Sequence, residues 1–229
     1  MGVFSKLTSS IRANPSLWEE TFDMSCSFKI DGVRLSYQHG RIWTKSGKNP
    51  LNAAVKELLI DSLNQFDGCE GIEGELVVSE DYRNGSITDT NSLLFSNRHQ
   101  DIWFYFNVFD IKPIYKNEAF IRRQKRIKQI LQPTNKTVMY SETKNPLIRL
   151  VRQYQVTNID EVVTMFNYVE RFGIEGIVLR KNDESYDSPI YKLRVGYDDE
   201  ERIRCRPVYK NRQYVGTCLL YTSPSPRDS

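Results

Sequence analysis

Residues 26–35 read Cys26-Ser-Phe-Lys-Ile-Asp-Gly-Val-Arg-Leu35, and this run is the most informative part of the chain. Apolar and polar residues alternate up to Asp31, which is typical of a strand with one buried face. A period of two places Lys29 and Asp31 on one face, opposite Phe28 and its apolar neighbours. We therefore expect a strand pair, or a strand and a turn, that presents a lysine and a carboxylate together.

Strands and helices are predicted to follow this run. A helical period over residues 51–66 predicts a helix with an apolar stripe of Leu51, Val55, Leu58, Leu59, Leu63 and Phe66. Thr157–Asp160 fits a capping box for a helix that reaches Phe172. Further strands are predicted at 71–78, 102–111, 175–181 and 190–195, and a basic helix at 121–131. Charged helix faces are usually solvated, and we favour that interpretation of the basic helix over nucleic-acid contact.

The composition favours a globular protein in a reducing compartment. Hydrophobic residues make up 39% of the 229 residues and charged residues 27%, with a formal net charge of +3. No apolar stretch approaches the ~20 residues of a membrane span, and the N-terminal sequence has no long apolar region typical of a secretory signal. Four scattered cysteines and two histidines disfavour a structural zinc site. We expect a cytoplasmic protein that does not contact membranes.

Charged residues recur on the same faces of the predicted strands. They are Lys29 with Asp31, Glu75, Glu175, and Lys192 with Arg194. A lysine amine can attack a phosphate once it has lost its proton, which nearby cations and a metal ion favour. Carboxylates can hold Mg²⁺, which accompanies phosphates, and cations neutralise the charge that builds up in phosphoryl transfer. The set predicts a site for nucleotide chemistry.

The order of short motifs along the chain adds a family resemblance. The motifs are Lys29-x-Asp-Gly-x-Arg34, Lys45-Ser-Gly47, Glu73-Gly-Glu-Leu76, Phe109-Asp110, Glu175-Gly-Ile-Val178 and Lys192-x-Arg194. In this order they resemble the motifs of covalent nucleotidyltransferases, and most closely those of small bacteriophage- or virus-type ATP-dependent DNA ligases. The resemblance covers about residues 25–195, which corresponds to the adenylation domain. It implies an α+β, ATP-grasp-like fold in which antiparallel sheets flanked by helices border a nucleotide cleft, with an OB-fold after it.

The resemblance also implies roles for the matching residues. Lys29 would attack ATP and carry AMP as a phosphoramidate, and Asp31 would orient the lysine and the ribose region. Lys192 and Arg194 would hold the α-phosphate, so these four residues are the expected catalytic group. Arg34 would contact the nucleotide or the phosphate at a nick.

Further residues are expected to bind the nucleotide and its metal ion. Glu75 would bind a ribose hydroxyl, and Phe109 would stack on adenine. Phe28 and Lys45 complete the expected nucleotide site. Glu175, together with Glu75, is expected to hold Mg²⁺.

Three positions depart from the family pattern. The family commonly has arginine where this chain has Lys45, so the charge is kept but the bidentate fork is lost. Lysine commonly stands where this chain has Arg194. Ser27 stands where DNA ligases often have a glutamate near the adenine, which bears on the preference for ATP.

The domain organisation is predicted from the same resemblance and from the C-terminal sequence. We expect the adenylation domain at residues 1–196 and the start of a truncated OB-fold at 197–217. Cys218–Asp228 resembles one reading frame of a transposase adapter used in sequencing libraries. Residues 218–229 are therefore expected to be a disordered, adapter-derived tail, and the natural chain to continue differently after about Thr217.

The implied activity is the sealing of nicks in double-stranded DNA by a monomer. Lys29 would be adenylated by ATP, AMP would pass to the 5′-phosphate of the nick, and the 3′-hydroxyl would displace AMP. One alternative is an RNA ligase or an mRNA-capping guanylyltransferase, which Arg34 modestly disfavours. The other is a non-catalytic nucleic-acid-binding protein that uses the basic helix.

Overall fold

The structure is a computed structural model that describes residues 23–47, 52–78, 104–188 and 190–195. It also describes single residues between 90 and 95, and the backbone alone of 205–210 and 213–219. Predictions for Leu51, for the segment before residue 23 and for the end of the chain after residue 219 lie outside these ranges.

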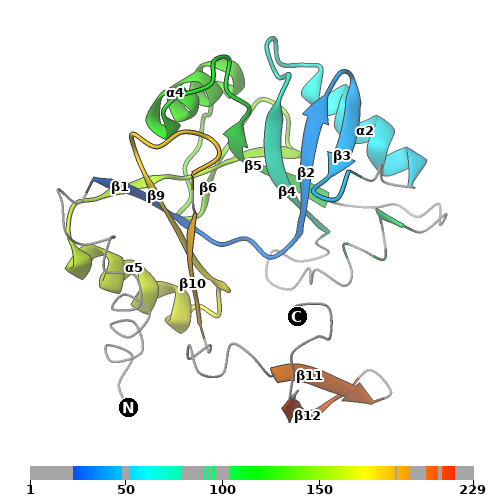
Figure 1. The fold of residues 1–229 in the computed structure, drawn as a ribbon. Helices are drawn as coiled ribbons and strands as arrows, with labels where there is room; N and C mark the ends of the chain where they lie inside the picture. Colours follow the sequence, from blue (N-terminus) through cyan, green and yellow to red (C-terminus); the bar gives the residue numbers. More distant parts are fainter. Residues whose placement is uncertain are drawn as a thin grey trace, which may run out of the picture.

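A six-stranded mixed sheet forms the larger half of the fold (Figure 1). Its order is β3 (Arg41–Thr44), β2 (Val33–Gln38), β4 (Ile72–Val78), β5 (Phe104–Ile111), β7 (Ile148–Val151) and β6 (Tyr140–Glu142). Strands β5 and β7 run parallel, and the other described pairs in this sheet run antiparallel. The expected antiparallel architecture is therefore confirmed with one parallel pair.

A four-stranded antiparallel sheet forms the second half. Its order is β10 (Tyr191–Arg194), β9 (Gly176–Lys181), β1 (Met24–Phe28) and β8 (Tyr154–Val156). A separate hairpin follows, of β11 (Cys205–Lys210) and β12 (Gln213–Leu219). Strand β12 includes Cys218 and Leu219, which the sequence prediction assigns to the tail.

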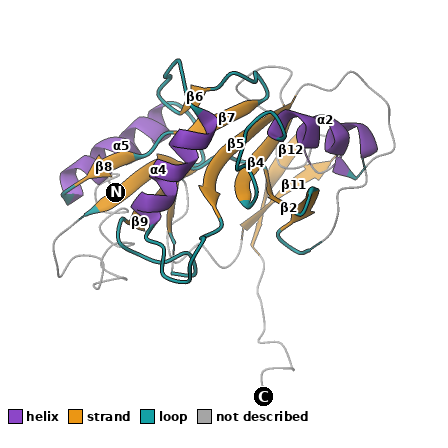
Figure 2. Cartoon of the chain, turned by 90° about the horizontal axis from the view of Figure 1, so that it is seen from above, coloured by secondary structure: helices purple, strands orange, loops and turns teal. Residues whose placement is uncertain are grey.

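Each sheet has its own hydrophobic core, and helices complete it (Figure 2). Helices α2 (Ala53–Leu63) and α4 (Phe120–Leu131) bury their apolar faces against the six-stranded sheet. Helix α5 (Ile159–Arg171) packs on the four-stranded sheet. The predicted α+β class with helices flanking the sheets is confirmed.

The chain crosses from one sheet to the other directly after β1. Strand β1 ends at Phe28, and the next strand, β2, begins at Val33 in the other sheet. All five residues of β1 are buried, and the strand lies between β9 and β8. The prediction that a half-exposed strand extends to Asp31 is therefore wrong about where the strand ends. Lys29 and Asp31 lie in the segment that crosses between the sheets.

Gly32 ends this crossing where the backbone passes close to β4. A Cβ atom on Gly32 would lie 2.4 Å from the Leu76 carbonyl oxygen and 3.0 Å from Cγ of Glu75. Such a contact cannot be relieved cheaply, because the nearest atom belongs to backbone of a central strand. The glycine of the Lys-x-Asp-Gly motif is therefore required by the close approach of two strands.

Two predicted helices differ in detail from their sequence patterns. Leu58, which the stripe of α2 places inside, is 44% exposed. Asn158 rather than Thr157 caps α5, and its side chain accepts from the Glu161 amide at 3.0 Å. The Glu161 side chain accepts from the amide of Thr157, the residue before the cap, at 2.6 Å, so the helix start is held by side-chain bonds that differ from the predicted capping box.

The basic helix α4 is only partly a solvated face. Arg122, Lys125 and Lys128 are exposed, as expected. Arg123 is fully buried instead and forms a bidentate pair with Asp110, at 2.9 Å and 3.2 Å. One arginine of the basic run thus holds the helix on the sheet.

A β-bulge in β5 changes which side chains face the second sheet. Glu73 pairs with Asp110 and Gly74 with Val108, so Phe109 is the extra residue. Strict alternation would place Ile111 on the face opposite Val108, yet both side chains lie in the same core cluster. Asp110 instead bonds Arg180 of β9 at 2.6 Å, which links the two sheets.

Candidate active site

Lys29 lies where the two sheets meet, and its side chain is paired with Glu175. The Lys29 amide donates to the Gly176 carbonyl at 2.8 Å, which fixes the backbone beside the start of β9. Lys29 Nζ donates to Oε2 of Glu175, and Oε1 of Glu175 pairs with Arg194 Nε at 3.2 Å. One carboxylate therefore holds two cations, one from the segment after β1 and one from β10.

Gly176 allows this arrangement because β9 and β10 approach very closely there. A Cβ atom on Gly176 would lie 2.0 Å from the Leu193 carbonyl oxygen. Arg194 is the register partner of Gly176, so the close approach sets Arg194 beside Glu175. The Glu-Gly-Ile-Val motif therefore requires a glycine at this position, because a larger side chain would clash with β10.

Glu75 and Lys192 belong to the same electrostatic group. Burial raises the pKa of the Glu75 carboxyl to about 7, although the charges of Lys29, Arg34 and Lys192 oppose this shift. Burial also lowers the pKa of Lys192, and the neighbouring charges of Lys29, Lys45 and Arg194 act in the same direction. The predicted charges from separate strands are thus brought into one site.

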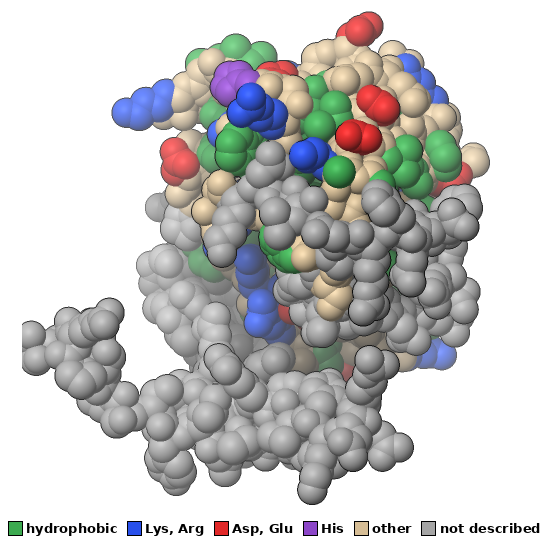
Figure 3. Space-filling model, turned by 90° about the vertical axis from the view of Figure 1, so that its right-hand side faces the viewer, with side chains coloured by type: hydrophobic (Ala, Val, Ile, Leu, Met, Phe, Trp, Pro, Cys, Tyr) green, Lys and Arg blue, Asp and Glu red, His purple; other side chains and the backbone are tan. Residues whose placement is uncertain are grey.

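Arg34 and Phe109 form a second part of the site. The Arg34 guanidinium carbon lies 5.4 Å from the centre of the Phe109 ring. Arg34 Nη2 pairs with Oε2 of Glu73 at 2.5 Å, while the Glu73 carboxylate is buried. Phe109 is half-buried, so part of the ring remains accessible for stacking. Figure 3 shows Lys and Arg side chains in a recess on this side of the molecule.

Contrary to the prediction, Asp31 and Phe28 do not join the charged side chains around Lys29. The Asp31 side chain is exposed, and among the described residues no hydrogen bond or ion pair joins it to Lys29. The Phe28 ring lies in the core, 6.0 Å from the ring centre of Tyr154 and 5.6 Å from that of Tyr168. Phe28 therefore supports the strand before Lys29 through its packing.

Sequence reasoning gave no role to the residues that link the sheets. Asp110 binds Arg123 and Arg180, and Tyr186 donates to Oε1 of Glu73. The sequence held little indication of these contacts. Asp110 is notable only because it follows Phe109, and Tyr186 stands alone in a polar loop. The contacts depend on a bulge and a loop conformation, which residue patterns do not encode.

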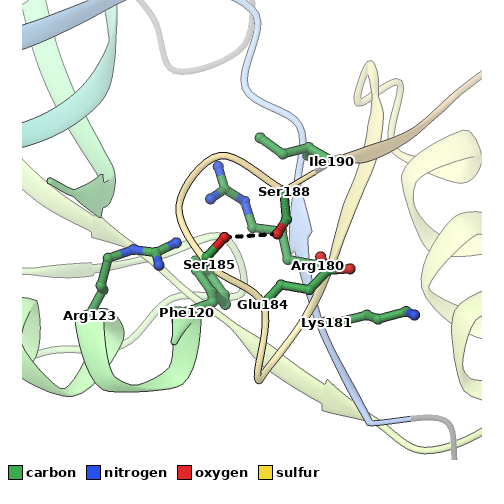
Figure 4. Close-up of a pocket in the computed structure, with 8 residues that line it drawn as sticks. All are labelled: Phe120, Arg123, Arg180, Lys181, Glu184, Ser185, Ser188 and Ile190. Atoms are coloured by element: carbon green, nitrogen blue, oxygen red, sulfur yellow. Dashed lines mark hydrogen bonds between the residues drawn. The ribbon is translucent and has the colours of Figure 1, made fainter. Parts of the chain in front are cut away.

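A small pocket lies at this link and away from Lys29. Phe120 and Arg123 of α4, Arg180 of β9 and the loop after β9 surround it (Figure 4). Ser185 and Ser188 in that loop lie 3.2 Å apart, oxygen to oxygen. Because none of the Lys29 cluster lines this pocket, it is not the predicted nucleotide site.

The residues present fit a nucleotide with its metal ion. Lys29, Lys192 and Arg194 offer positive charge to a phosphate, and the pKa of Glu75 shows a buried carboxyl whose charge is not fully compensated. A cation or a sugar hydroxyl would supply that compensation. No group of three or more metal-ligating side chains occurs among the described residues. Mg²⁺ commonly uses one or two carboxylates and takes its other ligands from phosphate and water, which two glutamates can satisfy.

The fold and the site together define a nucleotidyltransferase domain. Two sheets meet at a lysine, and carboxylates and cations from both sheets lie near it. The chain belongs to the family of the ATP dependent DNA ligase domain, whose model matches residues 6–192. Among curated protein sequences no significant match is found.

Solved structures of DNA ligases share the fold. The Chlorella virus DNA ligase-adenylate is 21% identical with a TM-score of 0.60, and the match covers 76% of this chain and 62% of the viral one. A Lig E DNA ligase is 18% identical with a TM-score of 0.58, covering 78% of this chain and 65% of its own. The bacteriophage T7 ATP-dependent DNA ligase complexed with ATP is 12% identical with a TM-score of 0.53, covering 85% and 66%. The chain thus spans about 62% of the length of the Chlorella virus enzyme.

The described helices include none that could cross a membrane, because none is both long and apolar enough.

Proposed function

We propose that this chain is the adenylate-transferring part of an ATP-dependent DNA ligase that seals nicks in double-stranded DNA. The observation that carries the proposal is the pairing of Lys29 Nζ with Glu175, within a group that also holds Glu75, Lys192 and Arg194. Membership of the DNA ligase family supports DNA as the substrate. Nothing in the described residues favours the RNA ligase, capping or non-catalytic alternatives over it.

In the first step Lys29 Nζ attacks the α-phosphorus of ATP. A P–N bond forms, the bond to the β-phosphate oxygen breaks, and pyrophosphate leaves. Glu175 holds Nζ in place, and the Lys29 proton has to leave before the attack. Lys192 and Arg194 offset the negative charge that builds up on the α-phosphate oxygens. Mg²⁺, when bound through Glu175 and Glu75, supplies further positive charge at these oxygens.

In the next two steps AMP moves to the DNA and is then displaced. A 5′-phosphate oxygen at the nick attacks the phosphorus of the lysyl adenylate, the P–N bond breaks, and Lys29 is regenerated. The 3′-hydroxyl then attacks the adenylated 5′-phosphate, and AMP leaves. Arg34 is the proposed contact to the nucleotide or the nick phosphate, and Phe109 the proposed stacking partner of adenine. We propose that the protein acts as an intracellular monomer.

Covalent labelling tests the first step. The protein is incubated with α-labelled ATP or GTP and Mg²⁺, and we expect a covalent adduct with ATP that is stable in alkali, labile in acid and abolished by Lys29→Arg. Arginine keeps the positive charge opposite Glu175 but cannot act as the nucleophile. Lys181→Ala, a lysine at the end of β9, is the matched control and should still be labelled. Labelling by GTP alone, or labelling that survives Lys29→Arg, would contradict the proposal.

Nick sealing tests the substrate. A duplex with one 5′-phosphorylated nick is offered with DNA on both sides of the nick, or with RNA on one side. We expect sealing of the all-DNA nick and loss of sealing in Lys29→Arg. Preferential sealing of RNA would favour the RNA ligase alternative.

A further inference from the structure

Tyr186 lies in the loop between β9 and β10 and reaches the buried carboxylate beside Arg34. Its hydroxyl donates to Oε1 of Glu73, and Oε2 of Glu73 accepts from Arg34 Nη2 at 2.5 Å. Each oxygen of Glu73 thus has one donor. Since buried carboxylates require such partners, both donors are needed to hold Glu73 in this orientation.

The Tyr186 ring is itself held from its other side. The Arg123 guanidinium carbon lies 5.4 Å from the ring centre. Arg123 is fixed by the Asp110 carboxylate, and its Nη1 donates to the Glu118 carbonyl at 2.5 Å. Tyr186 therefore has little freedom to move, although it lies in a loop.

These contacts form a closed path that starts and ends on neighbouring residues of β5. In order, the path is Asp110, Arg123, Tyr186, Glu73, Arg34 and Phe109. The two ends of the path lie at the bulge in β5, where the register with β4 shifts. A loop from the four-stranded sheet thus reaches a residue of the proposed site in the six-stranded sheet.

We infer that Tyr186 is a positioning residue, which holds Glu73 and through it places the Arg34 guanidinium over Phe109 for the step that Arg34 serves. The inference rests on the proposed function. Without the hydroxyl, Oε1 of Glu73 loses its donor. The Arg34 guanidinium is then the nearest charged group that can supply a second hydrogen bond, which draws it away from its position over the ring.

The test compares Tyr186→Phe with a matched control, Tyr37→Phe. The Tyr37 hydroxyl also donates to a side chain, Asn64 Oδ1 at 2.7 Å, but Tyr37 packs in the core and its bond is on the α2 side of the sheet rather than to Glu73. Lysine adenylation and nick sealing are measured separately. We expect Tyr186→Phe to slow the Arg34-dependent step about tenfold, as for the loss of one hydrogen bond to a charged group. Tyr37→Phe should leave both rates unchanged.

The double variant separates positioning from a general structural role. In an Arg34→Ala background, Tyr186→Phe should cause no further loss, because Tyr186 acts through Arg34. If the two losses multiply, Tyr186 acts independently of Arg34 and the inference is overturned.

One readout does not depend on activity. Side-chain NMR signals of the Arg34 guanidinium should shift and exchange faster with solvent in Tyr186→Phe, but not in Tyr37→Phe. Unchanged signals would overturn the inference even in an active ligase. Absence of any labelled adduct in the wild type would instead refute the proposed function, while the NMR result would still decide whether Tyr186 positions Arg34.

Discussion

Two clusters in this protein have the same charges but opposite surroundings. In one, Glu175 holds Lys29 and Arg194, and the three side chains are 24%, 14% and 45% exposed. In the other, Asp110 holds Arg123 and Arg180, which are 1%, 1% and 12% exposed. Each has one carboxylate and two cations, drawn from different elements of the fold.

The difference between the clusters is one of burial rather than of charge. Arg123 and Arg180 are satisfied by Asp110 in a dry environment, and burial lowers the pKa of Arg180. Lys192 and Arg194 remain exposed at the other cluster, where a phosphate can reach them. The Asp110 cluster therefore joins the sheets, and the Glu175 cluster is the one that we propose binds the nucleotide.

The largest expected effect is the loss of stability when the buried cluster loses its carboxylate. Asp110→Ala leaves two buried arginines without a partner, and we expect it to lower the free energy of unfolding by about 3–5 kcal/mol. Urea or thermal unfolding measures this change. Glu175→Ala is the matched control, and it should cost less than about 1 kcal/mol because its partners are partly solvated. Equal losses in the two variants would mean that burial does not distinguish the clusters.

The next effect should appear in catalysis and at the open cluster alone. Glu175→Gln removes the charge that holds Lys29 and Arg194, and we expect lysine adenylation to slow by about 10²–10³-fold. Its thermal stability should stay close to that of the wild type. Glu184→Gln, in the loop beside the buried cluster, serves as control and should label normally. A Glu175→Gln protein that is labelled at the wild-type rate would contradict the role of this cluster.

A smaller effect is expected in the dependence of stability on pH. In the folded protein burial raises the pKa of Glu75 from 4.5 to about 7, so the folded state binds this proton more tightly than the unfolded state. The stabilising contribution of the bound proton is complete below about pH 4.5 and is lost as the pH rises to about 7. Because the carboxyl is only partly shielded from water, we expect a loss of about 2 kcal/mol over this window.

The control for this pH dependence is Glu75→Gln. The difference in unfolding free energy between wild type and variant should change as the pH rises through about 7 and become constant about one pH unit higher. A difference that is constant from pH 4 to 8 would show that the Glu75 carboxyl titrates at its ordinary value.

The smallest effects are expected from exchanging arginine for lysine in the two clusters. Arg123 uses two nitrogens on Asp110, so Arg123→Lys should cost about 1–2 kcal/mol of stability. Arg194 makes one contact with Glu175, at 3.2 Å, so Arg194→Lys should change the adenylation rate less than about threefold. Unfolding and labelling assays on both variants check this. A larger effect at Arg194 would mean that its planar fork binds the nucleotide.

Much of the fold followed from local patterns. The helices at 53–63, 120–131 and 159–171 and the main strands were predicted because amphipathic periods and caps act over a few residues. Errors occurred where neighbours outside the segment decide the outcome. Leu58 continues the apolar stripe of α2 but is exposed, and Arg123 continues the charged run of α4 but is buried.

The residues of the site could be predicted from the sequence, but the contacts between them could not. The order of the motifs selected Lys29, Glu75, Glu175, Lys192 and Arg194, which the structure brings together. The partner of Lys29 proved to be Glu175 rather than Asp31, because β1 ends at Phe28 and the chain then changes sheets. An alternating residue pattern does not show where a strand ends when the end is set by the passage of the chain into another sheet.

The sequence by itself determined the family and the residues that carry charge into the site, because these depend on residue type and order along the chain. The tertiary structure alone decided which cations share a carboxylate, where β5 bulges, and that Tyr186 reaches Glu73. The physical reason is that burial and long-range pairing arise only when the two sheets pack. The sequence therefore identifies Lys29, whereas the pairing of Lys29 with Glu175 depends on the packing of the two sheets.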